Sequence, residues 1–565
     1  MNFLNYFKSD NKPYPQQEDF LNRANQWYPG PKKFLFGELG TGTGKTHLIH
    51  AILTAVGGYD CVTQVSLGDQ VTRDFKDVVS VYGGARYDCV QNGTDCRTGA
   101  QIQADAKEKP CEECPYREAK ERARGCRAVV TTYHYLINRV LYNPKDFPVG
   151  GDEGKPVLIL DEAHNFESIL LDFFSLNLDL AKLQDLFLFR LDEKLQTVGS
   201  PDRAALNKLL FETLPSLIEK RVQEWATEES GISGEMNDDE KELVEKIVRV
   251  TDRYRENQDL WIPVIEVGAH NHRHLKLRPV TVANEAQKIF DKFDKVICFS
   301  ATILDTKMFA KELGIETEDY EAVSMATNFP VDVRRVWLPT GNPYDMSYGK
   351  KDVSTHRMAE FISKVVSHAA LKDQRGIIHT NSFSGARELI EALVTWDRSI
   401  KSRLIWHDLA IFQQSRETLS RKEAQEAHRQ SRNGILISPS MSEGLNLADE
   451  DCRFCFVAKV PFLNHTDPYI DARARYFDAQ TGRPGVWKST QELRKLLQAC
   501  GRGVRHESDA CLTMILDTCF HRFASSCLAL KIVPESFKEA VEYFDGQPWM
   551  AVQQFQNLLA KGGSQ

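Results

Sequence analysis

The sequence predicts an α/β fold built on parallel sheets, and three observations lead to this prediction. An apolar run at residues 34–36 leads into a glycine-rich loop, and a helical stretch at 47–55 follows the loop. A strand at 61–66 and then a helix are expected within residues 61–84. A second series of strand, helix and strand occupies residues 376–459. Because strands that alternate with helices usually pair in parallel, we expect two such α/β units.

Length and composition limit the class of protein. A chain of 565 residues is expected to form two to four domains. Its 42% apolar and 27% charged residues are typical of a soluble protein, and no run approaches the ~18–20 apolar residues of a membrane helix. The N-terminus lacks a secretory signal, so we expect a cytoplasmic protein, or a nuclear one in a eukaryote, without a membrane partner. The net charge of −8 still permits a basic channel for nucleic acid.

The glycine-rich loop is the strongest chemical signal in the chain. Lys45 and Thr46 end a loop in which glycines alternate with threonines: Gly40, Thr41, Gly42, Thr43 and Gly44. Glycines let backbone N–H groups surround an anion, the lysine reaches the β- and γ-phosphates, and the threonine hydroxyl can bind Mg²⁺. The strict pattern has glycine where this chain has Leu39. A simple turn is the alternative, but the preceding strand and following helix favour a nucleotide site.

A glutamine upstream of the loop is a weaker candidate. Two prolines in residues 12–15 interrupt regular structure, and a helix is expected from about Gln16 with Phe20, Leu21 and Ala24 on one face. The amide of Gln17 could read an adenine edge, because it both donates and accepts hydrogen bonds. The alternative is an ordinary surface helix.

Residues 85–126 have too little apolar periodicity to build a core. Four cysteines fall in this segment with gaps of six, fourteen and two residues: Cys89, Cys96, Cys111 and Cys114. A metal that ties the segment together is the favoured interpretation over free buried thiols. The spacing leaves zinc and an iron–sulfur cluster both open. Cys126 is expected to pack. The odd total of thirteen cysteines indicates a reducing compartment rather than a disulfide framework.

A buried strand at residues 156–160 ends in an acidic pair. Asp161 can support Mg²⁺, and Glu162 can orient and deprotonate an attacking water. Such a pair is often a solvated turn, but together with the phosphate loop it predicts nucleoside triphosphate hydrolysis. His164 has either a coupling or a packing role.

The middle of the chain is helical and charged. Residues 176–195, 204–227 and 238–257 show helical periodicity and predict an inserted helical domain that serves as a scaffold. The strand at 294–303 then ends in Ser300, Ala301 and Thr302, which suit coupling of nucleotide state to a neighbouring site or form a plain turn. Residues 325–350 are expected to be a linker.

Two features of the last third remain. Cys452 and Cys455 have metal-like spacing, but packing is favoured because one lies in a buried strand with no partner pair. Gln498 opens a stretch whose Arg502 and Arg505 would share a helix face and could contact a triphosphate on the first unit. A solvated basic turn is the alternative.

These motifs occur in the order typical of a superfamily 2 helicase. The boxes end at Thr46, at His164 and at Thr302, and residues 442–446 and 498–505 resemble the fifth and sixth. The cysteines lie between the first two boxes, and a helical insertion separates the second from the third. Together these features resemble the XPD/DinG family of iron–sulfur DNA helicases over nearly the whole chain.

The resemblance implies a domain organisation. It implies two RecA-like domains with an inserted iron–sulfur domain and a helical arch. The expected first RecA-like domain comprises residues 1–84, 127–168 and 274–330, the iron–sulfur domain 85–126, the arch 169–273 and the second RecA-like domain 331–565. No N-terminal exonuclease domain is expected ahead of the helicase.

It also implies function and cofactors. ATP and Mg²⁺ would bind between the RecA-like domains, with Gln17, Glu443 and Gly444 among the contacts, and a 4Fe–4S cluster would bind Cys89, Cys96, Cys111 and Cys114. The expected activity is 5′→3′ movement of a monomeric motor along single-stranded DNA and unwinding of forked duplex DNA. Leu39 and Asn446 depart from the usual residues of the family. An RNA helicase, a translocase that removes bound proteins without unwinding, and an ATP-gated nucleic-acid-binding scaffold are the alternatives.

Overall fold

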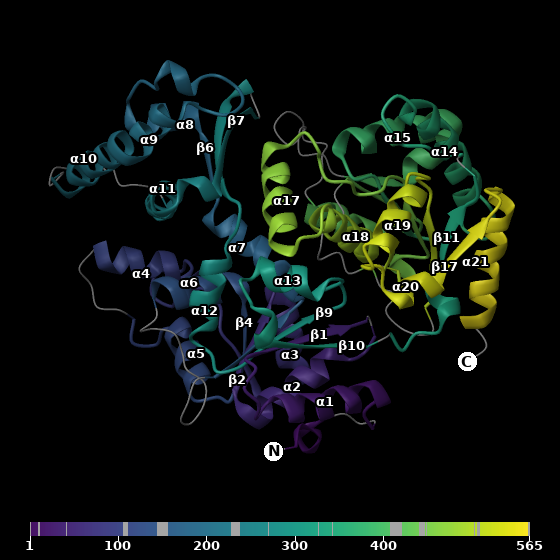
Figure 1. Ribbon diagram of the computed structural model, residues 1–565, viewed down its shortest axis with the longest axis horizontal. Helices are drawn as coiled ribbons and strands as arrows, with labels where there is room; N and C mark the ends of the chain where they lie inside the picture. The colour runs from purple at the N-terminus through teal and green to yellow at the C-terminus, as the bar shows by residue number, and fades with distance from the viewer. Residues whose placement is uncertain are drawn as a thin grey trace.

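The computed structural model describes residues 2–8, 12–40, 42–105, 111–143, 156–227, 238–268, 271–325, 327–341, 343–406, 421–439, 447, 449–501, 503–504 and 509–562. Two seven-stranded parallel sheets organise this part of the chain, and a three-stranded antiparallel sheet belongs to an insertion (Figure 1). Each parallel sheet is enclosed by apolar clusters on both faces. The prediction of an α/β protein with two parallel-sheet units is confirmed.

The first sheet has the order β10-β1-β9-β5-β2-β4-β3. Because β9 pairs with both β1 and β5, the carboxyl ends of these strands lie side by side. The strands are β1 (Phe34–Leu39), β2 (Gly58–Val62), β3 (Val78–Ser80), β4 (Ala128–Thr132), β5 (Val157–Asp161), β9 (Val296–Ser300) and β10 (Tyr320–Met325). Its helices are α1 (Pro15–Trp27), α2 (Lys45–Val56), α3 (Val65–Asp74), α6 (Tyr133–Tyr142), α7 (Phe166–Phe174), α12 (Ala283–Phe290) and α13 (Thr306–Glu312).

The second sheet has the order β13-β14-β12-β15-β16-β11-β17. The expected linker at 325–350 was wrong in part, because β11 pairs with β16 and β17 inside this sheet. The strands are β11 (Val336–Pro339), β12 (Gly376–His379), β13 (Leu404–Trp406), β14 (Ile435–Ser438), β15 (Phe454–Val457), β16 (Leu512–Ile515) and β17 (Val541–Phe544). Its helices are α14 (Lys351–Val366), α15 (Phe383–Trp396), α16 (Arg421–Gln430), α17 (Pro468–Thr481), α18 (Val486–Cys500), α19 (Phe520–Ala529), α20 (Glu535–Ala540) and α21 (Pro548–Gly562).

The insertion between β5 and β9 is not purely helical. Residues 176–179 were expected in a helix but form β6, because the alternating Leu176 and Leu178 turn inward and pair with β8. Its sheet is β6 (Leu176–Asp179), β8 (Arg273–Pro279) and β7 (Trp261–Val267). Its helices are α8 (Leu180–Phe187), α9 (Arg203–Lys208), α10 (Leu214–Thr227) and α11 (Asp238–Glu256), and they stand apart from the first sheet in Figure 1.

The predicted strand at 61–66 was misplaced. The strand is β2, and Val65 already begins α3. The prediction extended too far, to Ser66, and left out the first residues of β2, where Gly58 and Asp60 disfavour strands. Pairing with β4 and β5 on both sides overrides that preference. Two short helices, α4 (Cys96–Asp105) and α5 (Pro115–Arg124), accompany the cysteines. Within the described ranges, no helix is long and apolar enough to cross a membrane.

Candidate nucleotide site and cysteine cluster

The phosphate loop connects β1 to α2 and requires glycine at two positions. Gly42 and Gly44 have left-handed backbones, with φ of 80° and 70°. A Cβ at Gly42 would lie 2.1 Å from the ring of Phe329, and one at Gly44 would lie 2.3 Å from Gln17 Nε2. Only glycine combines this conformation with so close an approach. The loop therefore brings backbone N–H groups and the N-terminus of α2, which begins at Lys45, to one place.

Lys45 lies opposite the acidic pair. Its ammonium is 3.1 Å from Glu162 Oε1, and the side chains are 17% and 34% exposed. Glu162 has a φ of 54°, an unusual conformation for a residue other than glycine, and such strain is concentrated at functional sites. The start of α2 and the end of β5 thus bring together the lysine and the carboxylate that the sequence predicted, in a position where phosphate oxygens could compete for the lysine.

Asp161 lies at the end of β5 in a half-buried position. Burial, together with the charge of Glu162, raises the pKa of Asp161 to about 6, although the charge of Lys45 opposes the shift. Its carbonyl oxygen accepts a hydrogen bond of 2.8 Å from the hydroxyl of Tyr133. The sequence made no site prediction for Tyr133. The chain pattern contains no signal for this contact, which depends on how β4 and β5 flank β2.

His164 connects three motifs. Its Nδ1 is 2.8 Å from Ser300 Oγ and 3.5 Å from Glu162 Oε2, and its Nε2 is 2.6 Å from Gln498 Nε2. When the Gln498 amide donates to Nε2, the proton on Nδ1 is available to Ser300. Gln498 comes from α18 of the second sheet domain, so His164 joins the two domains beside the phosphate loop. Of the two roles considered for His164, these contacts favour coupling.

Gln17 is bound to the protein at both ends of its amide. Nε2 donates to the carbonyl of Thr43 at 2.9 Å, and Oε1 accepts from the N–H of Tyr14 at 2.9 Å. The expected apolar face of α1 is confirmed, since Phe20, Leu21 and Ala24 are fully buried. An adenine contact by Gln17 stays a prediction, and it would exchange one of these two bonds.

Several predicted site residues lie outside the described residues: Thr41, Glu443, Gly444, Asn446, Arg502 and Arg505. α18 ends at Cys500, with Gly501 as its cap. The predicted helix face of Arg502 and Arg505 lies outside the described residues and stays a prediction.

The four predicted cysteine ligands are packed together. Cys89, Cys96 and Cys111 are at most 5% exposed, and Cys114, Tyr87 and Tyr116 pack around them. A Cβ at Gly99 would lie 2.4 Å from Cys89 Sγ, so the glycine makes room for the cluster.

The pKa values of these thiols shift in opposite directions, since burial raises that of Cys96 to about 11 whereas that of Cys114 is lowered. Burial alone would raise the pKa of Cys114, but it is outweighed by backbone N–H groups of Arg117 and Tyr116 and by the thiols of Cys96 and Cys111, so the pKa is lowered. Metals bind the thiolate form that such contacts favour. Among the residues that the structure describes, no group of three or more His, Cys, Asp or Glu side chains is already arranged to hold a metal ion. The donor set is therefore suitable, while its arrangement is not that of a closed coordination shell.

Cys452 and Cys455 are buried and bond to backbone carbonyls, at Phe454 and Ala499 respectively. Both contacts are those expected of packing residues.

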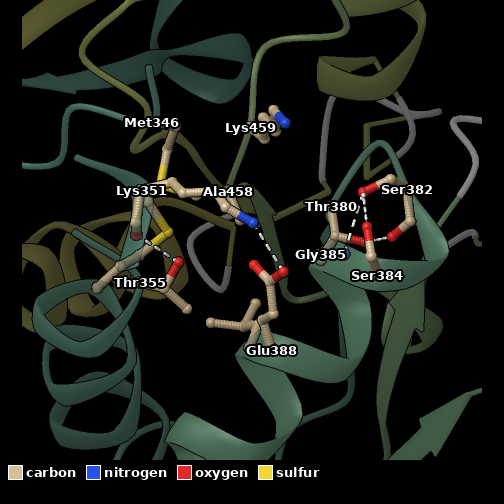
Figure 2. A pocket seen from close by; sticks show the side chains of 12 residues that line it. Met346, Lys351, Thr355, Thr380, Ser382, Ser384, Gly385, Glu388, Ala458 and Lys459 are labelled. Atoms are coloured by element: carbon tan, nitrogen blue, oxygen red, sulfur yellow. Dashed lines mark hydrogen bonds and ion pairs between the residues drawn. The ribbon is translucent and has the colours of Figure 1, made fainter. Parts of the chain in front are cut away.

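A pocket that the sequence did not predict lies at the carboxyl end of β12 (Figure 2). Ser382 caps α15 by accepting a hydrogen bond from the N–H of Gly385, and Lys351 pairs with Glu388 at 2.8 Å. Lys459, which follows β15, also lines the pocket. The pocket therefore combines a helix N-terminus with basic side chains in the second domain.

Two family models match parts of this chain. A helicase C-terminal domain model matches residues 365–535, and a DEAD_2 model matches residues 100–183. The chain is 33% identical over 106 residues to "ATP-dependent DNA helicase DinG" of Photobacterium profundum, which is 18% of this chain and 15% of that protein. It is 33% identical over 85 residues to "Fanconi anemia group J protein homolog" of Gallus gallus, or 14% of this chain and 7% of that protein. The matches thus span less than a sixth of these relatives.

Solved structures show the likeness over nearly the whole chain. A structure described as "XPD_Helicase" matches with a TM-score of 0.58 and 13% identity, covering 94% of this chain and all of that chain. Another, described as "XPD_APO", matches with a TM-score of 0.55 and 13% identity, covering 91% and 97%. At this identity the likeness establishes the fold.

Proposed function

Because the chain belongs to the XPD/DinG family of superfamily 2 helicases, we propose that it is an ATP-dependent DNA helicase that moves 5′→3′ on single-stranded DNA. The observation that carries this proposal is His164, which contacts Glu162, Ser300 and Gln498 and so joins both domains at the phosphate loop. Such a contact can couple the state of a bound nucleotide to the separation of the domains.

Hydrolysis would begin with an exchange of partners at Lys45. The β- and γ-phosphates of ATP would attract the ammonium away from Glu162, whose carboxylate would then orient and deprotonate the attacking water. Thr46 and Asp161 would hold Mg²⁺, which neutralises charge on the phosphates. Arg502 and Arg505 would stabilise the transferring phosphoryl group from the second domain, an effect worth ~10³–10⁵ in rate in related systems.

The cysteine segment would hold a 4Fe–4S cluster through Cys89, Cys96, Cys111 and Cys114. Its supporting observation is the thiolate-favouring environment of Cys114 within one thiol cluster. Bound there, the cluster would tie together a segment that has little apolar core of its own. We further propose that this segment and the insertion form the gate at which a forked duplex separates.

The second-domain pocket would hold a backbone phosphate of the DNA strand. Ser382 and Ser384 line it at the N-terminus of α15, where backbone N–H groups favour an anion, and Lys459 lines it from the segment after β15 (Figure 2). One copy of the chain would then carry both a nucleotide site and a DNA contact, so we propose that the motor acts as a monomer.

Strand displacement tests the proposal. The protein, purified without oxygen, is supplied with ATP and duplexes that carry a 5′ or a 3′ single-stranded tail. Unwinding from the 5′ tail alone is expected. Unwinding from the 3′ tail alone would contradict the polarity, and DNA-stimulated hydrolysis without unwinding would identify a translocase. Greater stimulation by RNA than by DNA would contradict the substrate.

A further inference from the structure

Three side chains on one face of α18 contact the first domain. Gln491, Arg494 and Gln498 are spaced three and four residues apart, so they lie on the same face of the helix. Gln491 donates to Glu312 of α13, and Gln498 contacts His164. Arg494 stands between them and is 5% exposed.

The guanidinium of Arg494 contacts three groups at once. Nε donates to the carbonyl of Thr302 at 3.0 Å, and Nη1 donates to Gln491 Oε1 at 3.0 Å. Nη2 is 3.9 Å from Glu312 Oε2, whose side chain is 2% exposed. A lysine would retain the charge but could not reproduce this planar set of donors.

The loop that Arg494 reaches is also held from the first domain. Ser300 Oγ accepts from the N–H of Thr302 at 3.0 Å and lies against His164. The N–H of Leu304 donates to Glu38 Oε1 at 2.7 Å, and Leu304 has a φ of 66°. A strained backbone persists only where its surroundings determine it strongly. Glu38 lies in β1, immediately before the phosphate loop. The loop at residues 300–304 therefore connects β1 to α18.

We propose that Arg494 is a positioning residue that anchors the Thr302 carbonyl and thereby aligns α18, with Gln498, on the nucleotide site. This inference rests on the proposed function and deepens it. Arg494 acts through Thr302 and Gln498, and it does not contact the phosphate loop in the hydrogen bonds and ion pairs of the described residues.

The surrounding charges determine which variant is informative. Burial raises the pKa of Glu312, and the charges of Arg494 and Arg473 oppose that shift. A neutral residue at 494 would leave a buried carboxylate without its nearest cation, a general destabilisation. Arg494→Lys retains the charge and removes the planar donor set, so it isolates positioning. Arg475→Lys is a matched control, because Arg475 is 76% exposed and pairs with Asp471 within the neighbouring helix.

Steady-state ATP hydrolysis with DNA is the first measurement. R494K is expected to lower kcat about tenfold while KM for ATP changes less than about twofold, because alignment rather than phosphate binding is lost. R475K should match the wild type. Gln491→Ala removes the side-chain oxygen that accepts a hydrogen bond from Arg494, and it is expected to lower kcat about threefold. An unchanged kcat in R494K, or an equal loss through KM alone, would overturn the inference.

Hydrogen exchange of the nucleotide-free protein separates this inference from the proposed function. Peptides that cover residues 300–306 should exchange at least about fivefold faster in R494K than in R475K. Unchanged exchange would overturn the anchor even if the wild type hydrolyses ATP. A wild type without hydrolysis would contradict the proposed function alone, and the exchange result would then decide the anchor. If R494K does not fold, Q491A decides by both measurements.

Discussion

The edge of the first sheet that carries the proposed nucleotide site, here the nucleotide edge, and the cysteine segment (residues 85–126) hold their candidate side chains in different ways. At the nucleotide edge, Lys45 begins α2, and Glu162 and His164 follow the end of β5, so all three are held by elements that pack in a large apolar core. In the cysteine segment, the only buried cluster in the described residues is formed by Cys89, Cys96 and Cys111 themselves. A core that exists before any ligand binds can position a site, whereas a segment without one depends on what its side chains bind.

The largest effect is expected from a variant that removes a charge at the nucleotide edge and leaves the apolar core unchanged. Lys45→Ala should lower ATP hydrolysis by at least about a hundredfold, because the phosphates lose a positioned charge. The melting temperature should change little, and DNA binding should remain measurable in a fluorescence anisotropy titration. Lys364→Ala, at an exposed lysine that is 58% accessible, is the control. Retained turnover in Lys45→Ala would contradict the phosphate-loop assignment.

The cysteine segment should respond in the opposite way. Cys111→Ser is expected to lose bound iron, colour and unwinding, while part of the ATP hydrolysis survives because the nucleotide edge keeps its core. Iron analysis and strand displacement on the same preparation measure both. Cys452→Ser is the matched control, since that thiol is buried in the second domain and lies against a backbone carbonyl and the thiol of Cys511. Stoichiometric zinc in an iron-free wild type would contradict the cluster.

Lowering the pH should change ATP hydrolysis and the stability contribution of Asp161 in opposite directions. Since the pKa of Asp161 in the nucleotide-free protein is about 6, kcat/KM for ATP should fall below pH 6, approaching tenfold per pH unit, as the carboxyl takes a proton. The folded state binds this proton more readily than the unfolded chain, so this group stabilises the nucleotide-free protein as pH falls from 7 towards 4. Asp161→Asn should remove that pH-dependent gain. Parallel losses of activity and melting temperature in the wild type would instead indicate acid unfolding.

The sequence predicted the local parts of this molecule better than its long-range contacts. The phosphate loop, the acidic strand end and the apolar face of α1 were recognisable because their signals lie within a few neighbouring residues. The strand β6 and the place of β11 were missed because each is stabilised by partners distant in the chain. Tyr133 and Arg494 were missed for the same reason, since one meets Asp161 across the sheet and the other meets Thr302 across the domains.

Tyr133 provides the smallest and most selective comparison. It is fully buried, and its hydroxyl fixes the carbonyl of Asp161 from a neighbouring helix. Tyr133→Phe should cost about 1 kcal/mol of unfolding free energy and lower kcat several-fold, because the acidic strand end loses one restraint. Tyr254→Phe is the matched control: Tyr254 is equally buried in the insertion, and in the described structure its hydroxyl has no hydrogen-bond partner. Denaturant unfolding and ATP hydrolysis on both variants would compare the two. Equal effects would mean that loss of a buried hydroxyl, rather than the contact with Asp161, explains the change, and the nucleotide edge would then owe its geometry to its apolar core alone.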